Sequence, residues 1–150
     1  GQTVSILADG ATHPERVVSS GEVTLDRAAS EVHVGLTYSA TLQTMRLDAG
    51  GADGTAQGKT KRITNVVVRL DQTGGGLRYV PTAVDADMDE FHIRDSYDPM
   101  DEAVPLFDGD TPVLPWPEGY EQDAKVTIRH TLPLPCTITA IMPHFLTPDR

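Results

Sequence analysis

Hydrophobic and polar residues alternate in several short segments of this chain, which is typical of β-strands with one buried and one exposed face. The longest alternating run begins at Val32 and passes through Leu36 and Tyr38 to Leu42. We expect its apolar positions to form the buried face of one continuous ribbon. Further strands are predicted at Val4–Ile6, Glu15–Ser19, Val23–Leu25, Leu77–Val80, Phe91–Arg94, Val126–Arg129 and Cys136–Met142.

The segment Gly58–Leu70 is predicted to be the central strand. It opens with three positive charges, Lys59, Lys61 and Arg62, and continues into a β-branched run that fits a pleated surface. Because apolar residues fall on both alternating faces, we expect this strand to be covered from both sides. Val66, Val68 and Leu70 share one face, and Ile63 and Val67 share the other.

Glycine, proline and acidic residues mark the predicted loops. A glycine-rich loop covers Asp48–Gly58, and an acidic loop covers Asp85–Glu102. The three glycines of Asp71–Gly76 predict a hairpin turn into the next strand, and Asp108–Asp110 predicts another turn. Three prolines in Thr111–Tyr120 remove too many N–H donors for a strand ladder.

These patterns predict an all-β fold. No apolar stripe at helical spacing extends over more than two turns, so little helix is expected. The frequent turn signals favour a sandwich or rolled antiparallel sheets with long loops and about eight to ten strands.

Composition narrows the class of protein. The 150 residues are 39% hydrophobic and 23% charged, which suits a single folded module over residues 1–150. The formal net charge of −10 disfavours contact with nucleic acid or an anionic membrane. No apolar run approaches membrane-spanning length, and a single cysteine allows no intramolecular disulfide. The start at Gly1 instead of Met indicates a fragment of a longer protein.

Two loops carry weak signals for ligand binding. Gly58-Lys59-Thr60 matches the end of a phosphate-binding loop, but Asp53 stands where that motif has glycine, and a predicted strand follows instead of a helix. The alternating Asp85, Asp87 and Asp89 start like a calcium loop. Glu90 and Ser96 occupy its required glycine and glutamate positions, so a solvated acidic loop is favoured and looser calcium binding is the alternative.

Histidine and cysteine give no clear catalytic or metal site. The five histidines have no zinc-site spacing. Cys136 and His130 could meet across the bend at Pro133–Pro135, which would pair a thiol with a base. The sequence shows neither an orienting group nor an oxyanion site, so a buried apolar cysteine is favoured over a nucleophile.

Aromatic residues surround the proline-rich loop. Trp116 and Tyr120 lie in this loop and Phe107 precedes it. If exposed, these rings would stack on a sugar or anchor a partner chain. The favoured interpretation is that Trp116 folds back over the end of a sheet.

Several segments, taken in order, resemble the C-terminal region of bacteriophage tail proteins of the nozzle or tail-tubular type found in short-tailed phages. The matching segments are Ile6–Gly10, Val34–Ala40, Gly58–Ile63 with Val66–Leu70, Pro105–Asp110, and Leu132–Ile138 with Ala140–Pro143.

The resemblance implies a β-rich, non-enzymatic virion component that assembles as a ring extending the tail tube. Its expected partners are copies of itself and other tail proteins, with no cofactor, metal or catalytic residue. Its expected location is the virion tail, and the cytoplasm of the producing bacterium beforehand. An acidic chain suits a lumen that must pass DNA, because like charge does not grip the phosphate backbone.

We therefore expect the chain to act through protein–protein assembly. The loops Asp48–Gly58, Asp85–Glu102 and Thr111–Tyr120 are the expected contact sites. One alternative is a carbohydrate-binding β-sandwich for host adhesion, and another is a hydrolase using Cys136 and His130. The candidate interaction residues are Lys59, Lys61, Arg62, Asp87, Asp89, Trp116 and Tyr120.

Overall fold

The computed structural model describes residues 1–48, 55–80, 88–99, 102–116 and 119–148. These residues form an all-β structure without helix, as the alternating segments predicted. Within these ranges no helix is long and apolar enough to cross a lipid bilayer. The strands are β1 (Thr3–Ala8), β2 (Ala11–Val17), β3 (Val32–Leu36), β4 (Ala40–Gln43), β5 (Arg62–Thr73), β6 (Leu77–Val80), β7 (Asp89–Phe91), β8 (Phe107–Asp110), β9 (Leu114–Pro115), β10 (Thr127–His130) and β11 (Thr137–Leu146).

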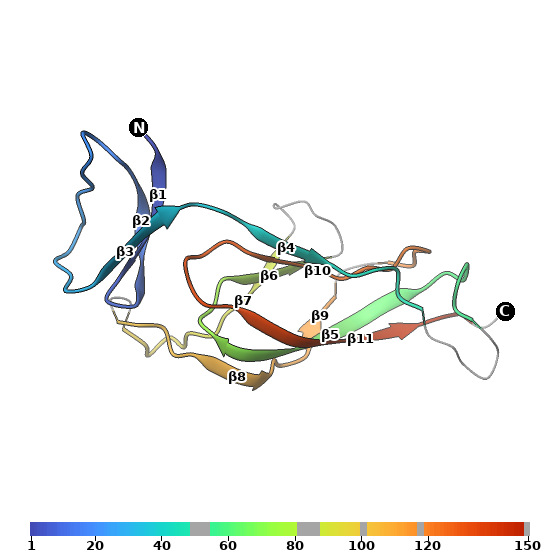
Figure 1. Cartoon of the computed structure of the whole chain (residues 1–150). Helices are drawn as coiled ribbons and strands as arrows, with labels where there is room; N and C mark the ends of the chain where they lie inside the picture. The colour runs from blue at the N-terminus through green and yellow to red at the C-terminus, as the bar shows by residue number, and fades with distance from the viewer. Residues whose placement is uncertain (49–54, 81–87, 100–101, 117–118, 149–150) are drawn as a thin grey trace.

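Two antiparallel sheets pack face to face as a β-sandwich (Figure 1). One sheet has the order β4-β10-β6-β7, and the other has the order β11-β5-β8 with β9 also paired to β5. Apolar side chains from both sheets form one buried cluster between them. Its members include Ile63, Val66, Val68 and Leu70 of β5, Leu77 and Tyr79 of β6, Phe91 of β7 and Ile128 of β10.

β5 is the central strand of its sheet, as predicted, but it is not covered from both sides. Val66, Val68 and Leu70 are buried, whereas Arg69 is exposed and Val67 is half-buried. The prediction that Ile63 lies on the face opposite Val66 is also wrong, because both side chains belong to the same buried cluster. The register against β11 gives the reason. Asn65 pairs with His144 and Ile63 pairs with Phe145, so Thr64 is one extra residue in β5. This bulge turns the Ile63 side chain to the same side of the sheet as that of Val66.

The segment Asp108–Asp110 lies within strand β8, so its prediction as a turn was wrong. β8 pairs with the second half of β5, where Gln72 adopts a φ of 44° in a register shift. The Asp108 carboxylate accepts a hydrogen bond from the Gln72 backbone N–H at 2.7 Å. A carboxylate that accepts a hydrogen bond from a backbone N–H stabilises a bulge in this way. A pattern of alternating hydrophobicity does not reveal such a bulge.

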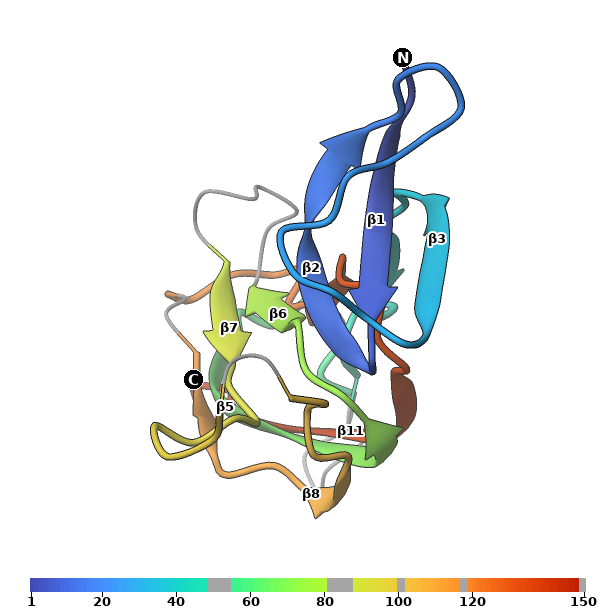
Figure 2. The same ribbon diagram turned by 90° about the vertical axis from the view of Figure 1, so that its left-hand side faces the viewer.

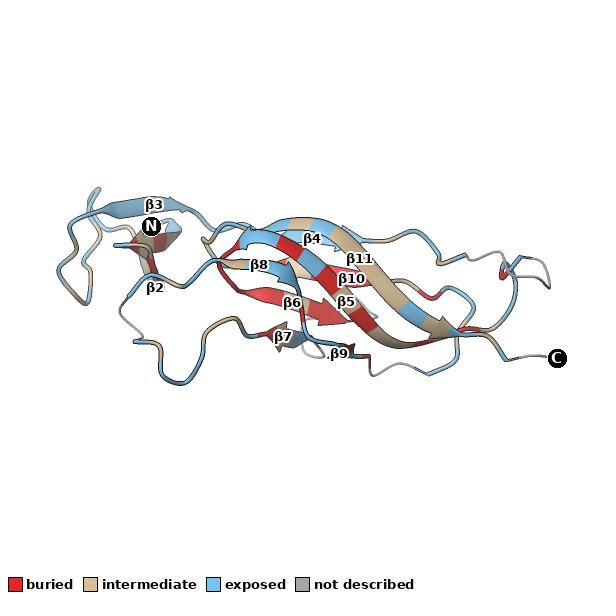
Figure 3. Cartoon of the chain, turned by 90° about the horizontal axis from the view of Figure 1, so that it is seen from below, coloured by how far each residue is buried: buried red, intermediate tan, exposed pale blue. Residues whose placement is uncertain are grey.

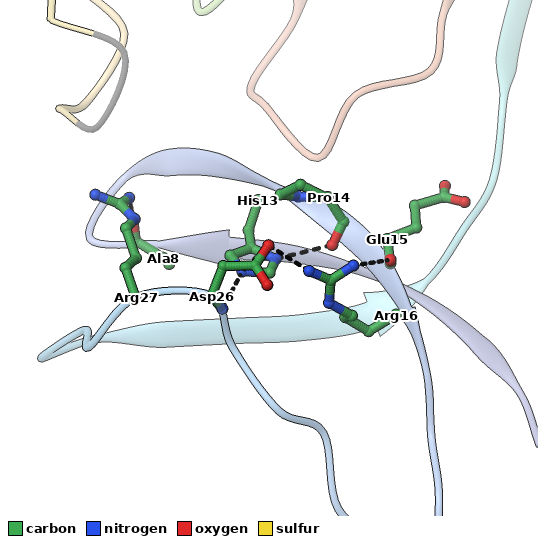
Figure 4. A network of polar contacts seen from close by, with 7 residues as sticks. All are labelled: Ala8, His13, Pro14, Glu15, Arg16, Asp26 and Arg27. Carbon is green, nitrogen blue, oxygen red and sulfur yellow. Dashed lines mark hydrogen bonds and ion pairs between the residues drawn. The ribbon is translucent and has the colours of Figure 1, made fainter.

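A smaller three-stranded sheet, in the order β2-β1-β3, lies at one end of the sandwich (Figures 1 and 2). Val4, Ile6 and Ala8 of β1 are buried. The loop of residues 18–31, which connects β2 to β3, lies against this sheet. One hydrogen bond that holds it there is donated by the Asp26 N–H to Nε2 of His13 at 2.9 Å (Figure 4). The other ring nitrogen of His13 therefore carries the hydrogen that it donates to the Pro14 carbonyl at 2.8 Å.

Arg16 and Arg27 hold the same loop at two further points (Figure 4). The guanidinium of Arg16 donates to the Asp26 carboxylate. That of Arg27 donates to the carbonyl of Ala8 at 2.8 Å. The predicted strand at Val23–Leu25 is thus a loop, tied down by side chains instead of by a strand ladder.

Two predicted connections differ from the structure. The continuous ribbon from Val32 to Leu42 is two strands in different sheets, because β3 pairs with β1 and β4 pairs with β10. The predicted hairpin at Asp71–Gly76 is instead a crossing between the two layers, since β6 pairs with β10 and β7 and not with β5. Turn residues indicate where the chain bends, but they do not fix the strand to which it returns.

Gly76 is required at this crossing. Its φ is +73°, and a Cβ added there would lie 2.6 Å from Leu132 side-chain atoms. We predict that Gly76→Ala lowers the free energy of unfolding by about 1–3 kcal/mol through backbone strain and this clash. Urea unfolding measures the change. Gly119→Ala is the matched control, because its Cβ meets nothing within 4 Å, and an equal loss in both variants would contradict the prediction.

Candidate interaction surface

The predicted basic cluster does not form one exposed patch. Lys59 and Arg62 are exposed, but Lys61 is fully buried. Its ammonium Nζ donates to the carbonyl of Gln122 at 3.3 Å, and its backbone bridges to Glu121. Lys61 therefore contributes to packing, and its inclusion among surface contact residues was wrong. β5 begins at Arg62, where a phosphate-binding loop would be followed by a helix. The structure therefore agrees with the interpretation of this segment as a glycine loop that enters a strand.

The acidic loop is described only in part. Asp85 and Asp87 lie outside the described residues, as do residues 49–54 of the glycine loop. Asp89 is exposed in the edge strand β7. Over the parts of the chain that the structure describes, no three His, Cys, Asp or Glu side chains are grouped so that they could hold a metal ion.

The proline-rich loop does not present the indole of Trp116. This side chain is only 4% exposed and stacks on Tyr79, with ring centroids 6.0 Å apart. This burial confirms the favoured interpretation that Trp116 folds back, so the indole is not available as an interaction residue. Tyr120 is exposed, so the pair offers no two-ring platform for a sugar.

Cys136 and His130 both line a cavity of about 330 Å³, but their environment opposes thiol catalysis. Burial raises the pKa of the Cys136 thiol, whereas a thiol nucleophile needs a lowered pKa. Burial also lowers the pKa of His130, and its Nε2 lies 2.9 Å from the Gly75 carbonyl oxygen. The His130 imidazole is thus hydrogen-bonded to the backbone of Gly75, in the segment that crosses from β5 to the other sheet.

The two lateral sides of the sandwich differ in chemistry. β4 and β11 are edge strands that line the same cavity, so they lie on one side (Figure 3). β7 and β8 are the edge strands of the other side, where Phe91 packs edge-on against Phe107 with centroids 5.6 Å apart. Asp89, Glu90, Asp108 and Asp110 place acids along that second side.

The β4–β11 side carries an apolar groove. A second cavity of about 390 Å³ lies between the small sheet and residues 131–133, lined by Leu7, Val34 and Leu132 among others. Tyr38 lines both cavities, so the two meet at this side chain. We name this surface the open side. It comprises β3, β4, the linking residues 37–39, residues 131–136 and β11.

Large apolar side chains of the open side remain exposed. The alternation in Val32–Leu42 predicted a buried face, and that prediction was wrong for this chain. Leu36 is 68% exposed and Tyr38 is 73% exposed. Val34, Leu36, Tyr38 and Leu132 line the same cavity, and exposed apolar side chains gathered in this way make a candidate interaction surface. The full set is Val32, Val34, Leu36, Tyr38 and Leu42 with Leu132 and Leu146.

The open side is also free of formal charge along its two main segments. Neither Val32–Met45 nor His130–Pro148 contains an Asp, Glu, Lys or Arg, in a chain where 23% of residues are charged. Charged side chains of the neighbouring segments contact the open side at polar positions: Arg129 donates to Thr41, Glu15 accepts from Thr37, and Glu31 pairs with His33. An apolar centre with a polar rim is the usual anatomy of a protein–protein interface.

The sequence contains a signal for this surface in its two uncharged stretches, Val32–Met45 and His130–Pro148. The two uncharged stretches were visible, but their separation along the chain hid the fact that they are neighbours. The pairing of β4 with β10, directly before residues 131–136, brings them together.

The comparisons with known proteins give no family for the chain. A scan against protein-family models finds no match, and a search of curated proteins finds none either.

The buried His130 predicts a pH dependence of stability. Its folded-state pKa lies below the ordinary value of 6.5, so the unfolded chain binds more protons in the window just below pH 6.5. The free energy of unfolding is therefore full above about pH 6.5 and falls as the pH is lowered through the folded pKa.

Urea unfolding at a series of pH values measures this loss, and His130→Gln should reduce the slope. His33→Gln is the control, because His33 is exposed and pairs with Glu31. An unchanged slope in His130→Gln would contradict the assignment.

Proposed function

We propose that the chain is a structural, non-catalytic module of a phage or prophage tail protein of the nozzle or tail-tubular type, acting through assembly with copies of itself and with other tail proteins. The observation that carries the proposal is the open side, where an apolar groove runs between sheet edges that pair with no further strand in the part of the chain that the structure describes. Such a surface is costly to leave in water and gains free energy when another chain covers it.

The segments that resemble tail proteins support the proposal by their position. Val34–Ala40 and Leu132–Ile138 are two of them, and both line the open side. In a module that acts through assembly, the residues that carry the function lie where chains meet. In an enzyme they lie around the reacting centre.

The charge balance suits a tail as well. A net charge of −10 opposes contact with DNA phosphates, so DNA passing a lumen built from such chains is not held. In this proposal the module is part of a longer protein, and other regions of that protein share the contacts that close the ring. The chain is then located in the virion tail, after synthesis in the bacterial cytoplasm.

Analysis of phage particles tests the proposal. Purified particles induced from the bacterium that encodes the chain should contain it by mass spectrometry, and immunogold electron microscopy should label the tail end of the particle. The capsid protein detected in the same preparation is the positive control, and antibody preabsorbed with the chain is the negative control. Particles that contain the capsid protein but not this chain would overturn the proposal.

A further inference from the structure

We propose that the β2–β3 loop, residues 18–31, is an acid-sensitive latch that is released from the small sheet when His13 gains a proton. The inference goes beyond the proposed function and does not rest on it, because it concerns a contact within one chain. It starts from the polar network of Figure 4, in which the side chain of His13 joins the loop to β2.

The hydrogen bonds of His13 require a neutral imidazole. Nε2 accepts the Asp26 backbone N–H at 2.9 Å, so this nitrogen carries no hydrogen. Nδ1 lies 2.8 Å from the Pro14 carbonyl oxygen, which only accepts, so Nδ1 carries the one ring hydrogen. A protonated imidazole has an N–H at both positions, and its Nε2–H would point at the Asp26 N–H. Two donors then face each other without an acceptor.

The burial of His13 makes this conflict costly. Its side chain is only 2% exposed, so little water is at hand to replace the lost hydrogen bond. His13 pairs with Ile6 of β1, and Ile6 is fully buried on the same face of the sheet. A buried donor without a partner opposes the folded arrangement. The loop therefore moves away at Asp26 once His13 is charged.

Three charged side chains surround this contact. The Asp26 carboxylate oxygen Oδ2 is 3.6 Å from Nε2, so it attracts a protonated imidazole. The same carboxylate already accepts from the Arg16 guanidinium, and that positive charge opposes a second cation beside it. Arg27 is directed at the Ala8 carbonyl, at 2.8 Å. For an imidazolium to take the carboxylate, Asp26 has to turn its N–H away from Nε2, which also ends the backbone contact.

The neighbouring strands bring no titratable group to this face of the small sheet. β1 has no titratable side chain. In β3, His33 pairs with Leu7, whereas His13 pairs with Ile6, and successive residues of a strand face opposite sides. The Glu15 carboxylate of β2 points away from His13 (Figure 4) and accepts from a threonine hydroxyl.

The two ends of the loop are held by other groups. The Val18 N–H donates to the Gln2 carbonyl at 2.9 Å. The Ser30 N–H donates to the Asp9 carboxylate, also at 2.9 Å. Loss of the His13 contact therefore frees the middle of the loop while its ends stay attached.

Release of the loop changes the surface of the small sheet. The loop crosses the face of β1 and β2 (Figure 2), and its residues Val23 and Leu25 are half-buried. Both lie within three positions of Asp26, so they leave the sheet with it. Mild acid then exposes apolar side chains that are partly covered at neutral pH.

NMR spectroscopy of the wild-type chain tests the latch directly. Nitrogen-15 shifts of the His13 ring should show the Nδ1–H tautomer at about pH 7.5 and the imidazolium at about pH 5.5, where side-chain carboxylates are ordinarily still ionised. Hydrogen exchange of the Asp26 amide, corrected for the intrinsic effect of pH, should accelerate about tenfold or more over this interval. The Val68 amide of β5 reports any loss of stability of the whole sandwich, and its acceleration should be smaller.

His13→Gln removes the titration but keeps one donor and one acceptor on the side chain. The pH dependence of Asp26 exchange should disappear in this variant, leaving a change of less than about twofold. His33→Gln is the matched control, because His33 is exposed and lies on the other face of the small sheet. It should keep the wild-type transition.

Arg16→Gln tests the charge balance and leaves His13 in place, so it serves also where His13→Gln does not fold. Without the Arg16 guanidinium, the Asp26 carboxylate is left to attract the imidazolium. The midpoint of the transition should therefore move to higher pH. A side chain with a merely structural role would not shift it in this direction.

Three results would overturn the inference. They are a His13 ring that stays neutral down to about pH 5, an Asp26 amide that stays protected when His13 is charged, and an unchanged transition in His13→Gln. The presence or absence of the chain in phage particles does not affect these outcomes, so the latch and the tail assignment fail separately.

Discussion

The burial of one face of β5 is the constraint on which the structure depends. Val66, Val68 and Leu70 are each at most 2% exposed, and they pack against side chains from the opposite sheet. β5 also supplies the pairing partner for β11, β8 and β9. The bulge near Thr64 brings Ile63 into the same core. β5 therefore keeps one buried face along its length although its pairing with β11 is interrupted there.

That constraint leaves the two lateral sides unequal. β5 lies between β11 and β8, so its sheet ends in an uncharged strand on one side and a strand with two aspartates on the other. The facing sheet ends in the same sense, with uncharged β4 above β11 and acidic β7 beside β8. Acids on an edge keep other strands away, and their absence on the opposite edge leaves it open to pairing.

Much of the fold could be predicted from residue patterns, because alternation and turn chemistry are local. The patterns located β1, β5 and β10 and the all-β class. They did not predict the partners of β6, since a glycine turn looks the same whether the chain returns to its own sheet or crosses to the other. Nor did they predict the burial of Lys61, which depends on the distant backbone carbonyl of Gln122.

The error at Val32–Leu42 has a different cause. An alternating pattern predicts which face of a strand leaves water, but it does not say which chain covers that face. Here the apolar side chains are present and their cover within the described part of the chain is incomplete, with Leu36 still 68% exposed. Under the proposed function the cover for these side chains is a partner chain. An alternating pattern can therefore mark a surface that is covered only on assembly as well as the inside of one folded chain.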